Sequence, residues 1–296
     1  MFDGRAVQES FGPGGAPAMT VHDGGLLLAW PTTDGNIRMA AGLEQDGVGE
    51  SWWLPDDFSL VRPSLASFGG RVYLSYGGMD QQSWLAVSYD GGRNFTDRSP
   101  WLPESIGSPT IFSFGEALWA SRTGVPDLGL SIGFGTNETL SFPSPSFLSL
   151  DMPLPETSID PPAISASVYD ELLLAWTGSN LRLNVQINPE NPSEPGRKVT
   201  FDDICRGGPA VAKLLFFSGF VYCGFDSHIY ILFNTEFLER DRAQRSKYAD
   251  TTAFCPAVCR LGNEVFVAWF GTDEANSLNF ANIGAMPVLE TVSHAP

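Results

Sequence analysis

The sequence has little positive charge and no long apolar run. Lys and Arg number 17 against 34 Asp and Glu, which gives a formal net charge of −17. Such a chain is a poor partner for nucleic acids and anionic membranes, because both carry negative charge. No stretch approaches the roughly 18 apolar residues of a membrane-spanning helix, and residues 1–11 lack the basic start and apolar run of a signal peptide. We expect neither membrane insertion nor nucleic-acid binding; action outside the cell stays open.

Cysteine is also scarce. The chain has four, all in the last third of the sequence: Cys205, Cys223, Cys255 and Cys259. Four cysteines allow three disulfide pairings. The C-x3-C spacing of the last two has no second pair at the spacing of zinc ligands. We expect buried thiols or one local disulfide, and no metal site built from them.

Charged residues are few, at 17%, whereas hydrophobic residues reach 43%. This balance excludes a disordered chain and supplies a large core. With 31 glycines and 22 prolines, the sequence predicts many turns. Its length allows two domains, but all-β propellers and barrels often use this length as one.

An internal repeat determines the predicted architecture. A short phrase, Pro followed by small or apolar residues, recurs at spacings of 46, 46, 53, 47 and 47 residues. The six positions are Pro17, Pro63, Pro109, Pro162, Pro209 and Pro256. Even spacing over the whole chain indicates six copies of one structural unit.

Each unit contains further short runs with the composition of strands. Thirteen or fourteen residues after the proline a hydrophobic run ends, and a third run begins beyond an acidic or amide residue. The second runs end at Trp30, Tyr76, Arg122, Trp176, Tyr222 and Trp269, and the polar residues are Asp34, Asp80, Asp127, Asn180, Asp226 and Asp273. Runs of four to seven residues, rich in aromatic and branched side chains and bounded by Gly, Pro, Asp and Asn, are typical of strands.

A weaker fourth element precedes most of the prolines. Four strands in about 47 residues match one propeller blade. We therefore predict an all-β, six-bladed propeller of four-stranded antiparallel blades, forming a single domain over 1–296. Either end of the chain can supply the last outer strand. Only residues 235–247 are compatible with a helix, and the Ser/Pro-rich segment 141–155 is predicted to be a loop on blade three.

Residues 88–95 read SYDGGRNF, and they resemble the Asp box of the sialidase superfamily, S-x-D-x-G-x-x-(W/F). Ser88, Asp90, Gly92 and Phe95 match, between the third and fourth runs of unit two. The wider repeat also resembles sialidase-like propellers, some of them lectins, across essentially the whole chain. In this resemblance Asp90 is a structural turn residue that accepts backbone N–H groups, and Phe95 anchors the blade core.

The sequence also differs from catalytic sialidases at specific positions. Those enzymes carry an Arg-Ile-Pro phrase, three arginines for the substrate carboxylate, and a Tyr/Glu pair with an Asp. Here the nearest phrase is Arg62-Pro63, and Arg122 is the one arginine at a run end. The negative charge would repel a sialic acid. We do not expect sialidase activity.

The repeat also predicts where a ligand binds. Strands alternate in direction, so the loops into the Pro phrases and after the second runs share one face, which we call the Pro-side face. The Asp box lies on the other face. The Pro-side face would carry the aromatic residues, Arg122 and the Asp/Asn ring named above, which could stack on sugar rings and bond their hydroxyls. Alternatively, the aromatic rings fill wedges between blades and the Asp/Asn residues cap turns.

Other candidate sites are weaker. His22, His228 and His294 fall in different units without a nucleophile partner. Asn94 and Asn137 begin glycosylation sequons, which matter only in a eukaryotic secreted protein. A basic island in the helix-compatible segment, which we interpret as a solvated face, contains Arg240, Arg242, Arg245 and Lys247.

The sequence thus favours a non-catalytic, carbohydrate-binding propeller that takes a neutral or amino sugar. A glycoside hydrolase with two carboxylates on the Pro-side face, and a scaffold that docks other proteins, stay open as alternatives. No cofactor is expected, and a structural or ligand-bridging calcium ion stays open.

Overall fold

The computed structural model describes residues 5–7, 15–44, 47–80, 82–102, 105–140, 148–167, 169–189, 196–214, 218–234, 243–273 and 277–285. His294, Arg240 and Arg242 lie outside these residues. The described part of the chain consists of strands and turns. It contains no helix that is long and apolar enough to cross a membrane.

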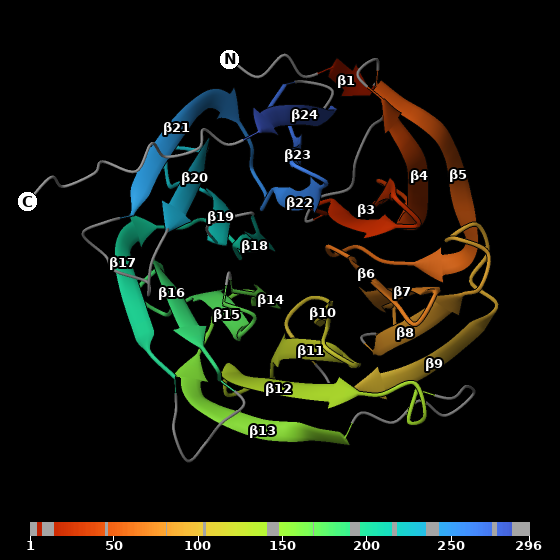
Figure 1. Ribbon diagram of the computed structural model, residues 1–296, viewed down its shortest axis with the longest axis horizontal. Coiled ribbons are helices and arrows are strands. Elements are labelled where there is room, and N and C mark those ends of the chain that lie inside the picture. The colour runs from red at the N-terminus through yellow and green to blue at the C-terminus, as the bar shows by residue number, and fades with distance from the viewer. Residues whose placement is uncertain are drawn as a thin grey trace, which may run out of the picture.

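The strands form six four-stranded antiparallel sheets around a central axis (Figure 1). The predicted six-bladed propeller is therefore confirmed. The strands of blades one to three are β2 (Ala18–His22), β3 (Gly25–Pro31), β4 (Asn36–Glu44), β5 (Gly47–Phe58), β6 (Ser64–Phe68), β7 (Arg71–Gly77), β8 (Ser83–Ser88), β9 (Asp97–Leu102), β10 (Thr110–Phe114), β11 (Ala117–Thr123), β12 (Gly129–Gly135) and β13 (Leu148–Thr157). Those of blades four to six are β14 (Ala163–Ala166), β15 (Leu172–Thr177), β16 (Arg182–Ile187), β17 (Lys198–Ile204), β18 (Ala210–Lys213), β19 (Ser218–Cys223), β20 (His228–Asn234), β21 (Gln244–Thr251), β22 (Ala257–Leu261), β23 (Glu264–Phe270), β24 (Leu278–Ala285) and β1 (Arg5–Val7).

The repeated proline marks the start of each blade. Every innermost strand begins one residue after it, as β2 does after Pro17 and β6 after Pro63. Proline has no N–H to donate, so it is tolerated at the first position of a strand. The innermost strands β2, β6, β10, β14, β18 and β22 then contact one another around the axis.

The ring is closed by the N-terminal strand. Strand β1 pairs antiparallel with β24, with Arg5 opposite Phe280 and Val7 opposite Leu278. Blade six is therefore built from both ends of the described chain, and β1 lies beside β24 in Figure 1. The sequence left this choice open.

Two local predictions were wrong. The described residues of the helix-compatible segment, 243–247, are not helical, because Gln244–Thr251 form β21, which pairs with β20. Arg245 and Lys247 therefore lie on a strand. The second half of the Ser/Pro-rich segment is also not a loop, since it forms β13, which pairs with β12 through two register shifts. Pro153 and Pro155 lie in this strand, which is the outer edge of the blade, and edge strands tolerate proline.

The core consists of six apolar clusters, one between each pair of neighbouring blades. Blades one and two, for example, share a cluster that includes Leu27, Met39, Leu74 and Phe95. The other clusters join blades two and three, three and four, four and five, five and six, and six and one. Neighbouring blades therefore depend on each other for burial.

The Asp-box turn follows β8 and holds itself together by short-range bonds. The Ser88 Oγ accepts the buried Gly92 N–H at 2.8 Å and donates to Asp90 Oδ1 at 2.7 Å. The Asn94 N–H donates to Asp90 Oδ1 at 2.9 Å. Phe95 is 3% exposed, between blades one and two. The buried donor of the turn is thus satisfied by Ser88, whereas Asp90 is exposed to water.

A set of charged and polar contacts also joins neighbouring blades. Asp57 on β5 is fully buried and accepts two bonds from Arg98 of blade two, at 2.6 Å from Nε and 2.8 Å from Nη2. It also accepts the Tyr76 hydroxyl at 2.7 Å. Burial, followed by the charge of Asp57, raises the pKa of Tyr76, so its hydroxyl stays a donor. We call this set an interblade clamp: an acid from one blade holding an aromatic residue and a base of the next.

The Asp-box turn gives the first prediction. Ser88→Ala leaves the buried Gly92 N–H without its acceptor, so we expect the free energy of unfolding to fall by about 1–3 kcal/mol. Phe95→Ala should lower it by about 3–5 kcal/mol through lost burial and a cavity. Asp90→Ala should cost least, because water can replace its exposed carboxylate. Urea denaturation measures all three, and a larger loss for Asp90→Ala than for Ser88→Ala would contradict this assignment.

The clamp gives the second prediction. Asp57→Ala leaves the Arg98 guanidinium, whose side chain is 26% exposed, without its counter-ion, and we expect a loss of about 3–5 kcal/mol in unfolding free energy. Glu50→Ala is the matched control, since Glu50 lies on the same strand and pairs with Arg93 at the surface. It should change stability little. Equal losses for the two variants, measured by urea denaturation, would refute a coupling role for Asp57.

Candidate functional site

The predicted Asp/Asn ring lies at six exposed turns of the Pro-side face. Each side chain accepts a backbone N–H within its own turn, two or four residues further on. The distances are 3.4 Å for Asp34, 3.1 Å for Asp80, 3.2 Å for Asp127, 3.1 Å for Asn180, 3.2 Å for Asp226 and 2.8 Å for Asp273. This is the bonding of turn caps.

The aromatic part of the predicted ring is buried. Trp30, Tyr76, Trp176, Tyr222 and Trp269 are 0% to 4% exposed, and each belongs to a different cluster between two blades. Ligand stacking needs a free ring face, so the burial of these five rings agrees with the alternative that the sequence left open. They fill the wedges between blades. Arg122, at the equivalent position of blade three, is half-buried.

The interblade clamp recurs at two more interfaces. Between blades four and five, Asp203 on β17 pairs with Arg245 on β21, at 2.5 Å from Nε and 2.6 Å from Nη2, and accepts the Tyr222 hydroxyl. Between blades three and four, Glu156 pairs with Lys198 at 2.5 Å. The Lys198 Nζ lies 5.3 Å from the centre of the Trp176 ring. The same three positions thus carry an acid, an aromatic residue and a base in each case.

The clamp between blades four and five borders an open groove on the Pro-side face. Its volume is about 350 Å³. The lining residues are Asp202, Asp203, Ile204, Tyr222, Gly224, Phe225, Asp226, Tyr230 and Arg245. Phe225 is 70% exposed and Ile204 is 49% exposed, so the groove has a free apolar surface beside fixed charges.

The clamp between blades one and two is more enclosed. Asp57 is fully buried and the Arg98 side chain is 26% exposed, whereas the Arg245 side chain is 45% exposed. The same arrangement is therefore a covered structural contact in one half of the ring and an accessible one in the other.

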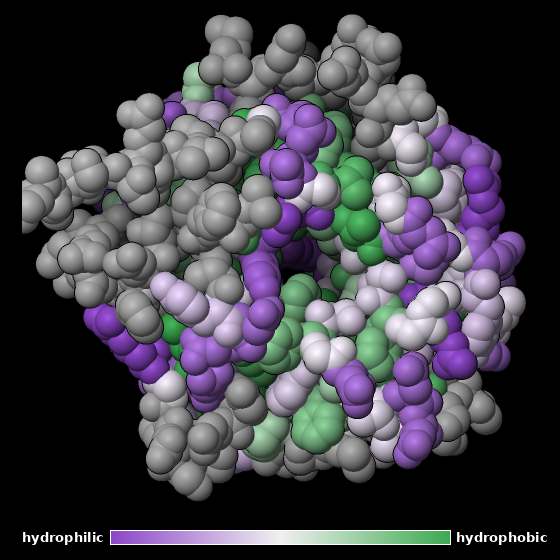
Figure 2. Space-filling model, in the orientation of Figure 1, coloured by the Kyte–Doolittle hydropathy of each residue, from purple (hydrophilic) through white to green (hydrophobic). Residues whose placement is uncertain are grey.

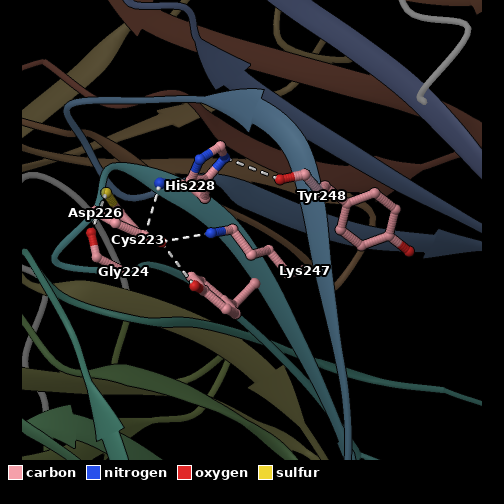
Figure 3. Close-up of polar contacts among 7 residues, drawn as sticks. Cys223, Gly224, Asp226, His228, Lys247 and Tyr248 are labelled. Carbon is pink, nitrogen blue, oxygen red and sulfur yellow. Dashed lines mark hydrogen bonds and ion pairs between the residues drawn. The ribbon is translucent and has the colours of Figure 1, made fainter.

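A second polar set in the groove centres on Asp226. Figure 3 shows its carboxylate contacted by the His228 backbone nitrogen and by the Lys247 Nζ, at 3.2 Å and 2.7 Å. The Tyr230 hydroxyl donates to it at 2.9 Å. These contacts, the Lys247 bond foremost, lower the pKa of Asp226 to about 2. The group is ionised at neutral pH and serves only as an acceptor.

The tyrosines of the groove are protonated, and each donates its hydroxyl hydrogen to a carboxylate, Tyr222 to Asp203 and Tyr230 to Asp226. The rings of Tyr222 and Tyr230 stack with centroids 5.4 Å apart and an interplanar angle of 9°. Burial, followed by the hydrogen bond to Asp203, raises the pKa of Tyr222 above its usual value. The groove thus offers a guanidinium, hydroxyls and carboxylates in fixed positions.

Sequence reasoning missed most of this groove. It named Tyr222 and Asp226, but not Phe225, Ile204 or Tyr230, and it placed Arg245 in a helix-compatible insert. A usable signal is present in the spacing. Asp57, Tyr76 and Arg98 recur 146, 146 and 147 residues later as Asp203, Tyr222 and Arg245.

The described residues contain no group of three or more His, Cys, Asp or Glu side chains that could hold a metal ion. The four cysteines are free thiols, three of them buried and Cys259 half-buried. Burial raises the pKa of Cys259 to about 12. This thiol is therefore protonated at neutral pH and a weak nucleophile.

No family model and no curated protein sequence matches the chain. Solved structures do. The fungal lectin AofleA from Arthrobotrys oligospora matches with a TM-score of 0.65 and 13% identity, over 96% of this chain and 87% of that one. A mutant of the NanB sialidase from Streptococcus pneumoniae matches with 0.63 and 9%, over 96% and 69%. The GH43_1 enzyme from Xanthomonas citri matches with 0.52 and 13%, over 95% and 90%. At these identities the likeness concerns the fold: the chain is a six-bladed β-propeller structurally similar to a fungal lectin and to sialidases.

Proposed function

We propose that the protein binds a glycan, and that the groove between blades four and five holds one of its sugar units. The observation that carries this proposal is the exposed Phe225 ring beside two ordered polar sets. A sugar presents apolar C–H faces together with hydroxyl groups. It is recognised by an aromatic platform flanked by fixed donors and acceptors. Arg245, Tyr230 and Asp226 supply the polar part.

The charge balance of the groove favours an uncharged sugar. Each of its three carboxylates already has a basic partner: Asp202 pairs with Arg182, Asp203 with Arg245 and Asp226 with Lys247. An anionic sugar would have to displace a carboxylate from its cation, which costs binding energy. A neutral sugar can bond to the paired groups as they stand. The likeness to a fungal lectin supports glycan binding, without bearing on which sugar is bound.

Binding is favoured over hydrolysis in this groove. A glycoside hydrolase needs one carboxylic acid that stays protonated near neutral pH, beside a second carboxylate. Asp226 does not fit the first role, because its pKa is lowered to about 2. Asp202 and Asp203 are each paired with an arginine, and such a partner favours the ionised form over the acid that hydrolysis needs. The equivalent turns of the other blades, at Asp34, Asp80, Asp127, Asn180 and Asp273, stay predictions as further glycan contacts.

The test is a glycan array followed by titration of the best ligand, alongside a panel of chromogenic glycosides. We expect binding without turnover. Phe225→Ala removes the exposed platform, so affinity should fall by about 1–2 kcal/mol, roughly ten-fold. Because this ring is 70% exposed, the variant should keep the thermal stability of the wild type.

Tyr169→Ala is the matched control. Tyr169 is 48% exposed and lies in the turn between β14 and β15, on the opposite face. It should bind as the wild type does. Equal binding by Phe225→Ala and wild type would move the site elsewhere on the ring. Silence on the array together with silence on the glycosides would favour a protein-docking scaffold.

A further inference from the structure

A second cavity lies on the axis of the ring, separate from the groove between blades four and five. Figure 2 shows the hollow at the centre of the ring. Its volume is about 270 Å³, and residues of all six innermost strands line it. A water molecule occupies about 30 Å³ in the liquid, so the cavity has room for several waters or a small ion. We call it the axial channel.

The charge of the axial channel is opposite to that of the protein. Among the residues that line it, three are basic, Arg62, Lys213 and Arg260, and none is acidic. The whole chain has a net charge of −17. Lys213 and Arg260 occupy equivalent positions near the ends of β18 and β22, so they lie at one mouth of the channel, on neighbouring blades. Arg62 precedes β6 and lies at the other mouth.

The Arg62 side chain reaches across its mouth of the channel to the far side of the ring. Its Nη1 donates to the Pro209 carbonyl at 3.4 Å and to the Cys255 Sγ at 3.1 Å, although these residues belong to the starts of blades five and six. Its Nε is buried and has no hydrogen-bond partner among the described residues. At the opposite mouth the Lys213 Nζ pairs with the exposed Asp170, and the Arg260 Nε donates to the Gly262 carbonyl at 2.7 Å.

The wall of the channel contains further donors without acceptors. Ser165 lines it, is 1% exposed, and its Oγ has no partner in the described part of the chain. Each of the six innermost strands is also the edge of its sheet. An edge strand leaves both N–H and C=O groups without ladder partners, and one of these donors, the Ile111 N–H, bonds to Ser64 Oγ at 3.0 Å. Cations, hydroxyls and backbone N–H groups are the groups that bind oxyanions.

We propose that the axial channel binds a small multivalent oxyanion. Arg260 and Arg62, for which the described residues supply no ion-pair partner, give the two mouths their positive charge, and Ser165 supplies a hydrogen bond inside. Lys213 lies beside Arg260 but already pairs with the exposed Asp170, so it adds to the attraction only where the anion displaces that carboxylate. The acidic outer surface does not prevent this, because at physiological ionic strength charges beyond about 8 Å are screened. The site shares no lining residue with the glycan groove, so neither proposal depends on the other.

Inorganic phosphate is the probe. Equilibrium dialysis at pH 7 should show saturable binding to the wild-type protein, displaced by sulfate and much less by chloride. Lys213→Gln/Arg260→Gln should weaken binding at least ten-fold. Ser165→Ala, which removes only the unpaired hydroxyl, should weaken it a few-fold and leave the melting temperature without phosphate unchanged.

Arg71→Gln/Arg93→Gln is the control, because it removes the same charge from exposed or half-buried positions outside the channel, where these arginines lie against Tyr89 and Trp52. It should bind phosphate as the wild type does. The proposal is overturned if the wild type shows no saturable binding, if chloride competes as well as sulfate, or if the control loses as much affinity as the channel variant. Circular dichroism confirms that each variant is folded.

Discussion

Packing between neighbouring blades is the interaction on which every other feature of this propeller depends. Each of the six apolar clusters takes its side chains from two blades, so no blade buries its own core. A single four-stranded sheet with both faces exposed would not be stable in water. The ring therefore has to close, and it closes where β1 joins blade six.

The interblade clamps add specificity to this packing. A buried ion pair contributes little net stability compared with an apolar contact, but breaking it is costly, so it fixes how two surfaces meet. The clamps of Asp57 and Asp203 place Tyr76 and Tyr222 identically at two interfaces. The Asp57 clamp is enclosed, whereas the Asp203 clamp opens to solvent. The same three residue types therefore form a structural contact at one interface and part of a candidate binding surface at the other.

The sequence predicted the ring well and the site poorly, for a physical reason. The spacing of the repeat reflects how many residues one blade needs, so the number and order of the blades could be predicted from it. Prolines such as Pro63 precede the innermost strands, where no backbone N–H is required for pairing, and they mark where each blade begins. Burial depends on which blade lies beside which side chain. Trp30 and Phe225 are both aromatic residues near the end of a second strand, yet one is fully buried and the other 70% exposed. Arg245 was misplaced because its outer strand lacks an alternating apolar pattern, and the edge strands of a ring need none.

The seam at blade six has a consequence for how the protein is made. Arg5 and Phe280 are partners although almost the whole chain separates them. During synthesis the first strand must wait, unpaired, until the last blade has left the ribosome. Contacts this distant in sequence slow folding, and an unpaired edge strand is open to wrong partners meanwhile. Strand β1 has only three residues. So short a strand pairs weakly with other chains, which limits the risk of wrong pairing before blade six is complete.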